Sequence, residues 1–312
     1  MKIFLILNGG RKPVAESLVQ NLKTLLRENR ADHRVEVSHS LEHAHSLVDE
    51  AAAGGFDSLW VGGGDGTIHN VLNHAVSRGM TLAVVPMGTV NALARSLGIP
   101  LKPVAAVRHL LKCKPQPMDV GLINGTQRFL CFASIGFDAA IVHDVSGPFK
   151  RYGGRVAYFL AGCRALFRRD RIHPFAASLD SSSRQLEEDD TSAQLPDPLR
   201  QTGYSLVVSN IRNYAGFPMF HTVLPDSGSM ELWLFRKPKV RQILLWGCLS
   251  FFRRKNKHKA CGHNVGHYLV NKFTIHGDQP LFLQLDGEAV SLANNREFQF
   301  ECLPGAVHVL MS

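Results

Sequence analysis

Cysteine is scarce in this sequence, and long hydrophobic runs are absent. The six cysteines lie far apart and form no Cys-x-x-Cys pair, which argues against a zinc ribbon, a thioredoxin-like motif and a disulfide framework. The longest apolar stretch, residues 243–252, has 10 residues, whereas a helix that spans a bilayer needs about 20. The apolar run at residues 3–7 is too short for the core of a signal peptide. We therefore expect a soluble, cytoplasmic protein in a reducing compartment.

Acidic residues are outnumbered by basic ones. The chain has 35 Lys and Arg against 26 Asp and Glu, a formal net charge of +9. This excess favours an anionic partner such as a phosphate, a nucleic acid or an acidic membrane surface. No nucleic-acid-binding motif accompanies the charge, so we expect no nucleic-acid partner. The length of 312 residues is about twice that of a common domain, which predicts two domains.

The first 120 residues alternate between strand and helix patterns. Apolar runs at residues 2–7, 34–38, 58–61 and 81–85 predict buried strands, and apolar residues at helical spacing predict helices between and after them, including 41–53 and 91–97. Strands that alternate with helices over short loops are typical of a doubly wound parallel sheet. We therefore expect an N-terminal α/β domain over residues 1–120.

The pattern changes to short β runs near residue 118. Aromatic, β-branched and Gly residues predict antiparallel strands at 129–133, 205–209, 230–235, 272–276, 281–285 and 298–302. These strands predict a C-terminal antiparallel β-sandwich domain over residues 121–302. Residues 181–202 are rich in Ser, Asp, Glu and Pro, and we expect them to be a disordered surface insertion without an assigned function.

A glycine-rich loop lies between the third predicted strand and the helix that follows. It reads Val61-Gly62-Gly63-Gly64-Asp65-Gly66-Thr67. Successive glycines let backbone N–H groups and a helix N-terminus face a phosphate. The Asp65 carboxylate would repel a bare polyphosphate, so it fits this loop if Mg²⁺ lies between them or if it orients a hydroxyl. The alternative is a structural strand–helix turn in which Asp65 caps a helix.

A second loop follows the fourth predicted strand. It contains Gly88, Thr89 and Asn91, and either Thr89 or Asn91 could cap the next helix and donate to a phosphate or a sugar. Taken alone, this segment is equally well explained as a capped turn. Because both loops lie at the carboxyl ends of neighbouring strands, they predict one ligand-binding crevice.

The two loops together, G-G-D-G-T at 63–67 and P-x-G-T-x-N-x-x-A-x-x-L-G-I-P at 86–100, resemble the soluble diacylglycerol-kinase-type lipid kinases. This family includes bacterial diacylglycerol kinases and the sphingosine and ceramide kinases. Further motifs follow in the family's order: M-D-V-G at 118–121, S-I-G-F-D-A at 134–139, S-N and Y-A-G within 209–216, and L-D-G-E at 285–288. The resemblance implies an NAD kinase/diacylglycerol kinase-like fold with the active site between its two domains. It also implies a last strand, here 303–312, that can return to the first domain.

The resemblance implies that ATP and Mg²⁺ are bound by the N-terminal domain. The implied nucleotide-binding residues are Asn8, Gly9, Gly10, Arg11, Lys12, Ser38, Gly63, Gly64, Asp65, Gly66, Thr67, Gly88, Thr89 and Asn91. Arg11 or Lys12 would meet phosphate. The implied reaction transfers the γ-phosphate of Mg·ATP to a lipid hydroxyl, and diacylglycerol to phosphatidic acid is the first expectation.

The family's general base is the glutamate of Asp-Gly-Glu. Here it is Glu288, with Asp286 beside it, and Asp65 is the third catalytic candidate. A lipid hydroxyl is a weak nucleophile, so a carboxylate must accept its proton. From the residues alone, Asp286-Gly287 is also a good β-turn, in which Glu288 would be a solvated turn residue.

The chain departs from the family at the magnesium site of the sandwich. Ser227 stands where an aspartate is usual, which leaves Asp226 as the candidate ligand. Two alternatives to the lipid kinase stay open. One is an NAD kinase-like enzyme, which shares the G-G-D-G-T motif, and the other is a catalytically weak regulator that binds a nucleotide or a lipid.

Basic and aromatic residues are concentrated in two segments. Residues 236–259 contain nine Lys or Arg and no Asp or Glu, with aliphatic and aromatic residues between them. Residues 150–171 are a second basic stretch with interleaved aromatic residues. This pattern is typical of an interfacial helix that binds anionic lipid, and the alternative is a core helix with charged ends. We expect peripheral binding to the inner face of the membrane, where the lipid substrate lies. The sequence sets no oligomeric state and leaves a homodimer open.

Overall fold

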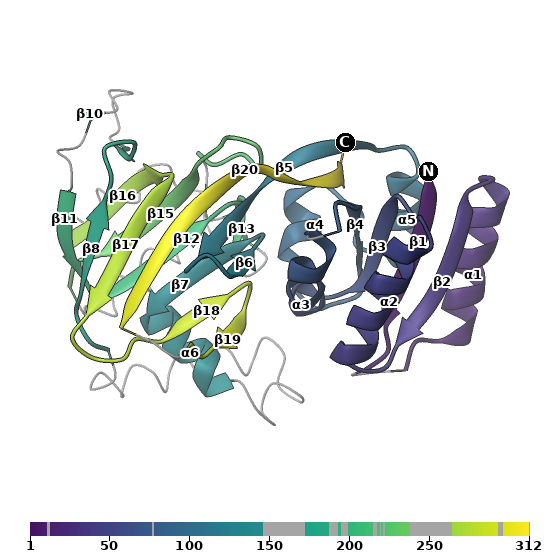
Figure 1. Ribbon diagram of the computed structural model, residues 1–312, viewed down its shortest axis with the longest axis horizontal. Helices are drawn as coiled ribbons and strands as arrows, with labels where there is room; N and C mark the ends of the chain where they lie inside the picture. The colour runs from purple at the N-terminus through teal and green to yellow at the C-terminus, as the bar shows by residue number, and fades with distance from the viewer. Residues whose placement is uncertain are drawn as a thin grey trace. The chain divides into compact units, whose positions relative to one another are not determined.

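The structure is a computed structural model, shown in Figure 1. It describes residues 1–10, 13–76, 78–145, 172–186, 193–194, 199–214, 217–218, 220, 222–237, 264–292 and 296–311. The chain divides into two compact units. The first unit comprises Met1–Met118 and Gly305–Ser312, and the second comprises Asp119–Pro304.

The first unit is built on a parallel sheet in the order β2-β1-β3-β4. Its strands are β1 (Lys2–Asn8), β2 (Asp32–Ser38), β3 (Ser58–Gly63) and β4 (Thr81–Pro86). The C-terminal end of β20 (Glu297–Met311) extends this sheet beside β4, where Val309 pairs with Leu82 in parallel. The central strands are buried on both faces, which explains why they read as continuous apolar runs.

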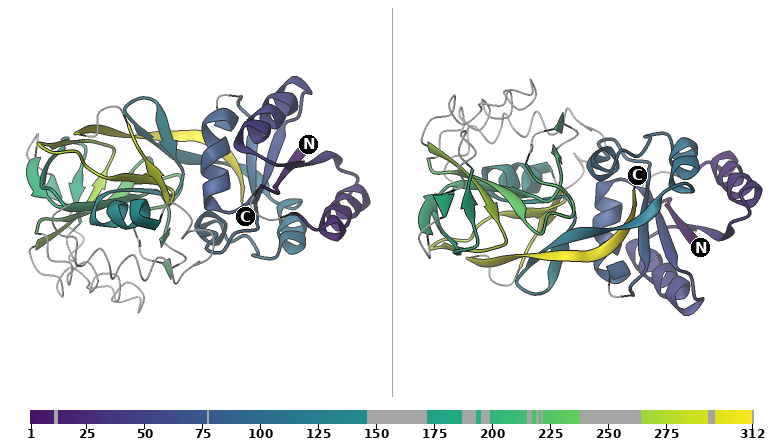
Figure 2. Two further views of the ribbon diagram at one scale, coloured as in Figure 1. Left: turned by 90° about the horizontal axis from the view of Figure 1, so that it is seen from below. Right: turned by 90° about the horizontal axis from the view of Figure 1, so that it is seen from above.

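Helices cover both faces of this sheet, as Figure 2 shows. They are α1 (Glu16–Glu28), α2 (Leu41–Ala53), α3 (Asp65–Val76), α4 (Ala92–Ser96) and α5 (Pro103–Leu110). Helix α1 packs against α5, and α2 packs against α3. An apolar stripe of Leu22, Leu25 and Leu26 buries one side of α1. The N-terminus of α2 is capped by the Ser40 hydroxyl, which accepts a hydrogen bond from the His43 N–H at 3.1 Å.

The second unit is a sandwich of two antiparallel sheets. One sheet has the order β10-β9-β16-β15-β12-β7-β18-β19. The other is β11-β8-β17-β20, with β5 paired to β20 and β6 paired to β5. The bounds are β5 (Lys114–Ile123), β6 (Gln127–Phe129), β7 (Phe132–Gly136), β8 (Phe175–Leu179), β9 (Arg184–Gln185), β10 (Ala193–Gln194), β11 (Leu199–Gly203), β12 (Ser205–Ser209), β15 (Met230–Phe235), β16 (Val265–Val270), β17 (Lys272–Gly277), β18 (Leu283–Leu285) and β19 (Glu288–Val290). A short hairpin of β13 (Asn213–Tyr214) and β14 (Phe217–Pro218) and one helix, α6 (Phe137–Val145), complete the described elements.

The core of the second unit lies between its two sheets. Inward-facing side chains from both sheets form one buried apolar cluster. Within it, the rings of Phe273 and Phe300 stack with their centroids 4.5 Å apart. This packing explains the alternation of apolar and polar residues in β17.

The structure confirms the expected fold class, a doubly wound parallel sheet followed by an antiparallel sandwich. Two predicted segments are wrong in detail. The expected strand at 129–133 is divided between β6 and β7, because the backbone N–H groups of residues 130–132 bind the Asp286 carboxylate instead. The expected disordered insertion at 181–202 contains most of β11, an edge strand paired with β8, while residues 187–192 and 195–198 lie outside the described residues. Within the described ranges, no helix combines the length and apolarity needed to cross a membrane.

Candidate active site

The glycine-rich loops of the first unit lie at one edge of the parallel sheet. Strand β1 ends at Asn8, β3 ends at Gly63, and β4 ends at Pro86, which pairs with Gly63. Strand order reverses between β1 and β3, because β2 lies on one side of this pair and β4 on the other. In open α/β sheets, ligands bind beside such a reversal, at the carboxyl ends of the strands.

A hydrogen bond crosses this reversal point. The Asn8 side chain donates from Nδ2 to the Thr67 hydroxyl at 2.7 Å, and its Oδ1 accepts from the Gly10 N–H at 2.9 Å. The loop after β1 is therefore tied to the start of α3. This bond fixes the positions of two predicted nucleotide-binding loops relative to each other.

Asp65 connects the two glycine-rich loops. Its carboxylate accepts hydrogen bonds from the backbone N–H groups of Ala92 at 2.9 Å and Leu93 at 3.2 Å. These N–H groups open α4, where a helix has no partners of its own. Asp65 thus caps a helix, as in the structural alternative given for it, but this helix belongs to the other loop and is not the one that Asp65 itself begins.

Asn91 closes its own loop. It has a left-handed backbone conformation with φ of 52°, and its side chain forms no cap of α4. Instead, its Oδ1 accepts from the Gly88 N–H and its Nδ2 donates to the Gly88 carbonyl, both at 2.9 Å. The prediction that Asn91 could cap the following helix is wrong, because the Asp65 carboxylate occupies that place.

The two loops approach each other at glycine. A Cβ on Gly88 would lie 2.6 Å from the Cα of Gly64, closer than side-chain carbons and backbone approach one another. The Met87 N–H also donates to the Gly63 carbonyl at 2.8 Å. Glycine is therefore required here by close backbone packing, in addition to any contact with a ligand.

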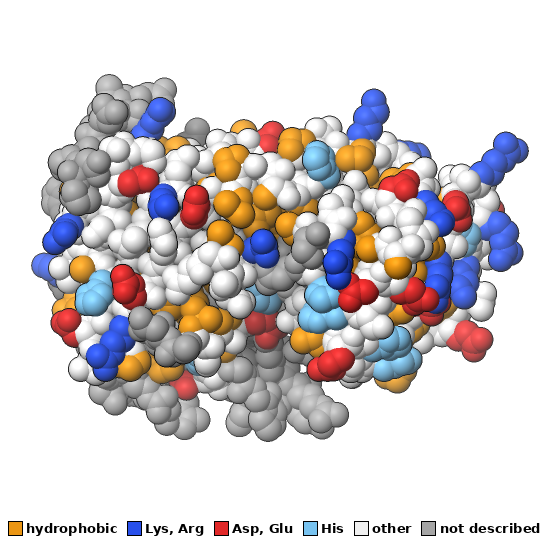
Figure 3. All heavy atoms as spheres, in the orientation of Figure 1, with side chains coloured by type: hydrophobic (Ala, Val, Ile, Leu, Met, Phe, Trp, Pro, Cys, Tyr) orange, Lys and Arg blue, Asp and Glu red, His pale blue; other side chains and the backbone are white. Residues whose placement is uncertain are grey.

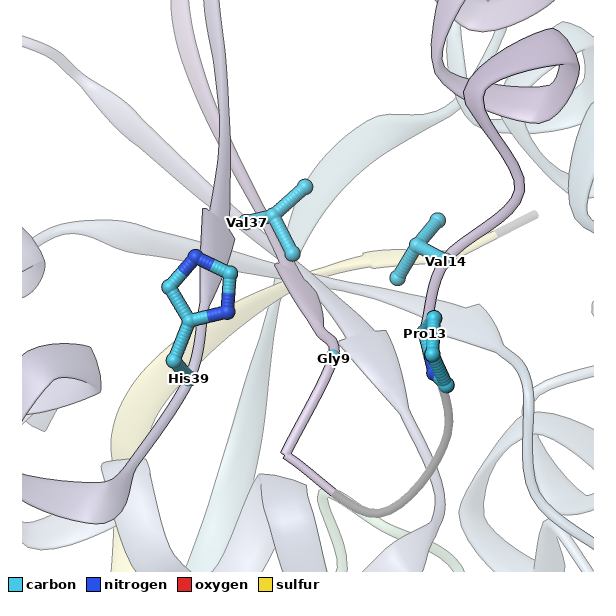
Figure 4. A pocket seen from close by; sticks show the side chains of 5 residues that line it. All are labelled: Gly9, Pro13, Val14, Val37 and His39. Carbon is cyan, nitrogen blue, oxygen red and sulfur yellow. The ribbon is translucent and has the colours of Figure 1, made fainter.

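An open cavity of about 410 Å³ lies beside the loop after β1 (Figure 4). Gly9, Pro13, Val14, Val37 and His39 line it. Figure 4 shows Val14 and Val37 extending toward each other above Gly9, with the His39 ring at one side. His39 was not predicted from the sequence; the available signal was its position directly after β2, at the same edge of the sheet as the glycine loops.

The other predicted nucleotide-binding residues of this unit have different exposures. Thr89 is exposed, and Gly66 and Thr67 are partly exposed. Ser38 is only 2% exposed and its carbonyl accepts from the Gly9 N–H, so it supports the loop from below. Arg11 and Lys12 lie outside the described residues.

Asp286 and Glu288 belong to a tight hairpin in the second unit. It joins β18 to β19, with Leu285 paired to Glu288. Asp286 and Gly287 have φ values of 51° and 84°, the left-handed conformations of a two-residue hairpin turn. The β-turn that the sequence predicts at Asp286-Gly287 is therefore present. Its two central residues are the first two residues of the Asp-Gly-Glu motif.

The Asp286 carboxylate anchors this hairpin. It is 4% exposed and accepts three backbone hydrogen bonds, from Leu130, Cys131 and Phe132 at 2.8–3.0 Å. Glu288 is partly exposed at the start of β19. The two acids therefore differ in environment, and Glu288 is the more accessible of them for chemistry.

The loop that would carry the family's magnesium site is closed by protein groups. Asp119 accepts from the Gly228 N–H at 2.6 Å, and the Ser227 hydroxyl lies 2.9 Å from the Leu224 carbonyl and 3.0 Å from that of Ser229. Asp226 is exposed. In the described part of the chain, no three His, Cys, Asp or Glu side chains converge as a metal site requires. The described residues of this loop do not fit a structural metal ion.

The basic and aromatic segments largely lie outside the described residues. Of residues 236–259 only 236 and 237 are described, and of residues 150–171 none is. On the face shown in Figure 3, the described Lys and Arg side chains of the second unit stand singly among acidic and neutral ones.

Comparisons with known proteins identify sequences similar to this chain. The family model for the diacylglycerol kinase catalytic domain matches residues 2–123. The "Probable lipid kinase YegS-like" of Pseudomonas aeruginosa (strain UCBPP-PA14) is 37% identical over 175 residues, which are 55% of this chain and 55% of the relative. This match therefore spans about half of the relative's length. The protein of that name in Klebsiella pneumoniae (strain 342) is 27% identical over 97% of this chain and 93% of its own length.

Solved structures share the fold over the whole chain. A diacylglycerol kinase from Bacillus anthracis str. Sterne has a TM-score of 0.68 at 20% identity, covering 100% of this chain and 97% of its own. A second structure from that organism has a TM-score of 0.73 at 22% identity with the same coverage. At these identities the structural likeness establishes the fold. The sequence matches and the ordered motifs show that the chain is similar to the diacylglycerol-kinase-type lipid kinases, and residues 2–123 match the catalytic domain of that family.

Proposed function

We propose that this protein is an ATP-dependent lipid kinase that transfers the γ-phosphate of Mg·ATP to a lipid hydroxyl, with diacylglycerol as the first candidate acceptor and phosphatidic acid as its product. The observation that carries the proposal is the pair of glycine-rich loops at the strand reversal. The bond from Ala92 to Asp65 connects the two loops, and the bond from Asn8 to Thr67 connects the loop after β1 to the first of them. Such pre-organised backbone suits a phosphate chain, because its donors need no rearrangement on binding.

The nucleotide would be bound by the first unit. Backbone N–H groups of residues 64–66 at the start of α3 and the exposed Thr89 hydroxyl would donate to the phosphates. The cavity beside Gly9 is apolar on its Val14 and Val37 sides and has an imidazole at its edge, which suits a purine ring. Mg²⁺ would enter with ATP, held mainly by the phosphates, and would neutralise their charge.

The acceptor hydroxyl would be activated by Glu288. Its carboxylate would take the hydroxyl proton while the lipid oxygen bonds to the γ-phosphorus and the bond from that phosphorus to the bridging oxygen of ADP breaks. Asp286 would hold the hairpin through its three backbone bonds. Asp65 would act as a positioning residue for the loop around Thr89, since its oxygens accept from α4.

The lipid would be reached at a membrane surface. The nine basic residues in the segment 236–259 would attract anionic headgroups, while its aromatic and aliphatic residues enter the interface. Electrostatic attraction of this kind predicts weaker vesicle binding at high salt.

The test is phosphate transfer from radiolabelled Mg·ATP. Purified protein would be given mixed micelles of diacylglycerol, monoacylglycerol, ceramide or sphingosine, with NAD in a parallel reaction. A labelled lipid establishes the kinase and identifies its acceptor. Label in NAD would replace the proposal by an NAD kinase activity. ATP binding without transfer to any acceptor would favour a regulator, and the lipid kinase proposal would fail.

A further inference from the structure

A buried polar cluster lies beside the hairpin of β18 and β19, which contains Asp286 and Glu288. Ser134 on β7 and Gln284 on β18 are paired opposite each other in the sheet, and both are fully buried. Asp138 follows in the first turn of α6. Its carboxylate accepts hydrogen bonds from the Ser134 hydroxyl, from the Tyr214 side chain, and from Gln284 Nε2 at 3.4 Å.

The amide of Gln284 connects this cluster to the turn. While Nε2 donates to Asp138, the Oε1 atom accepts from the Gly287 N–H at 2.8 Å. Gly287 directly precedes Glu288. The turn is thus held at two places, at Asp286 by the backbone of residues 130–132 and at Gly287 by the Gln284 amide.

These contacts use both functions of the amide. A side chain at position 284 must donate on one side and accept on the other, and glutamine is the residue of this shape that does both. If the amide rotated by half a turn, its oxygen would face the Asp138 carboxylate and its NH₂ would face the Gly287 N–H. The Asp138 carboxylate therefore selects the orientation in which the amide oxygen supports the turn.

We propose that Asp138 and Gln284 are positioning residues for phosphate transfer: Asp138 orients the Gln284 amide, and the amide holds the Gly287 peptide so that Glu288 stays in place to accept the hydroxyl proton. This inference rests on the proposed function. The proposed arrangement brings together three motifs that are far apart in the chain: the S-x-G-F-D-A segment, the tyrosine of the Y-A-G segment and the D-G-E segment.

Among the described residues, the titratable groups near the amide lie on α6 and on the hairpin. Burial raises the pKa of Asp138, and the hydrogen bonds from Ser134, Tyr214 and Gln284 act against that rise. On α6, His143 bonds the Leu283 carbonyl of β18 at 2.8 Å. The hairpin itself carries Asp286 and Glu288. A new acid at position 284 would face the Asp138 carboxyl across the same hydrogen bond.

The test is the variant Gln284→Glu, which keeps the shape and the acceptor for Gly287. When the new carboxyl is protonated it can donate to Asp138 as the amide does, and when it is ionised two carboxylates face each other. We expect kcat near that of the wild type at the acid end of the activity range. At higher pH we expect kcat to fall by about 100-fold, the loss that a misplaced catalytic group can cause, with KM for ATP unchanged.

A reversed pair provides the rescue. In the double variant Asp138→Asn, Gln284→Glu, the asparagine NH₂ can donate to the new carboxylate, so we expect activity to return at the pH where the single variant is inactive. Ser205→Ala is the matched control. It removes a buried hydroxyl from the neighbouring strand β12, where Ser205 donates to the Ile135 carbonyl and contacts no part of the turn in the described bonds.

The possible results separate the two proposals. A Gln284→Glu pH profile parallel to that of the wild type, or a double variant no more active than the single one, would overturn the positioning role. Thermal unfolding of each variant shows whether that variant is folded. If Gln284→Glu is not folded, the activities of the double variant and of Asp138→Asn alone decide whether the positioning role is correct. If the wild type phosphorylates no lipid, the proposed function fails, and this inference fails with it.

Discussion

Asp65 lies in α3, yet its carboxylate binds the backbone N–H of Ala92 at the start of α4, 27 residues further along the chain, at 2.9 Å. This bond, with its neighbour at Leu93, makes one structure out of two loops that the sequence presents separately. For a carboxylate in a loop that is predicted to bind phosphate, a role at the metal is the first expectation. The geometry instead assigns Asp65 a structural role, because its carboxylate caps the start of α4, the helix that follows Thr89.

The variants Asp65→Ala and Asp65→Asn separate these roles. Alanine removes both acceptors, so we expect it to destabilise the first unit by about 1–2 kcal/mol and to weaken ATP binding by about tenfold. Asparagine retains one acceptor oxygen and should lose less of both. Calorimetric titration with a non-hydrolysable ATP analogue and thermal unfolding measure the two effects.

The control for this pair is Asp49→Asn. Asp49 is an exposed carboxylate of the same unit that pairs with Arg78 and His74 at the surface, and its loss should change ATP affinity little. If Asp65→Asn abolished turnover while ATP affinity and unfolding stayed those of the wild type, the positioning role would be wrong and a role at the metal would replace it.

The positions of the loops could be predicted from the sequence, whereas their connections could not. Apolar runs and glycines mark where strands end and loops begin, and these signals are local in the chain. The partners of Asp65 and Asp286 lie 27 and up to 156 residues away. Such bonds between a side chain and distant backbone depend on the folded arrangement and leave no periodic signal. The distant Asp65 also explains why Asn91, one of the two predicted caps, does not cap α4: the Asp65 carboxylate binds the first N–H groups of that helix, and the Asn91 side chain binds Gly88.

Glu288→Gln should abolish turnover and leave the fold intact. The glutamine keeps the size of the side chain but cannot accept the hydroxyl proton, so we expect kcat to fall by about 10²–10⁴-fold. ATP binding should be nearly unchanged, because the predicted nucleotide contacts belong to the first unit. Lipid phosphorylation at the wild-type rate would remove Glu288 from its proposed role.

Asp286→Ala should act mainly on stability. The carboxylate is buried and accepts hydrogen bonds from three backbone N–H groups, which its removal would deprive of that acceptor. Since each hydrogen bond to a charged group contributes about 1.5–3 kcal/mol, we expect a loss of at least about 3 kcal/mol in urea unfolding of the second unit. Stability within about 0.5 kcal/mol of the wild type would show that the anchoring bonds contribute little.

The buried carboxyl of Glu231 is expected to make the free energy of unfolding depend on pH. It is 1% exposed, and burial acts against its ionisation, but bonds from His267 and from the N–H groups of Thr222 and Val223 outweigh burial and lower its pKa. A carboxyl with a lowered folded pKa stabilises the fold above its ordinary value of 4.5, and this contribution is lost as the pH falls through the lowered value.

We therefore expect Glu231→Gln to flatten the acid side of the stability curve, below roughly pH 5. The free energy of unfolding would be measured by urea titration across that range. Glu301→Gln, at a half-exposed side chain whose carboxylate lies 3.9 Å from the Lys272 ammonium, is the control and should keep the wild-type slope. An unchanged slope in Glu231→Gln would mean that other carboxyls cause the acid sensitivity.

The cavity beside Gly9 can be tested with His39→Ala. If the purine ring lies against this imidazole, its loss should weaken ATP binding by about 3- to 10-fold, the size of one aromatic contact. Affinity for inorganic triphosphate, which has no base, should stay the same. His43→Ala is the matched control, because the two rings stack with centroids 5.6 Å apart but His43 does not line the cavity. Equal losses for ATP and triphosphate would assign His39 to the phosphates, and no loss for either would place the base elsewhere in the first unit.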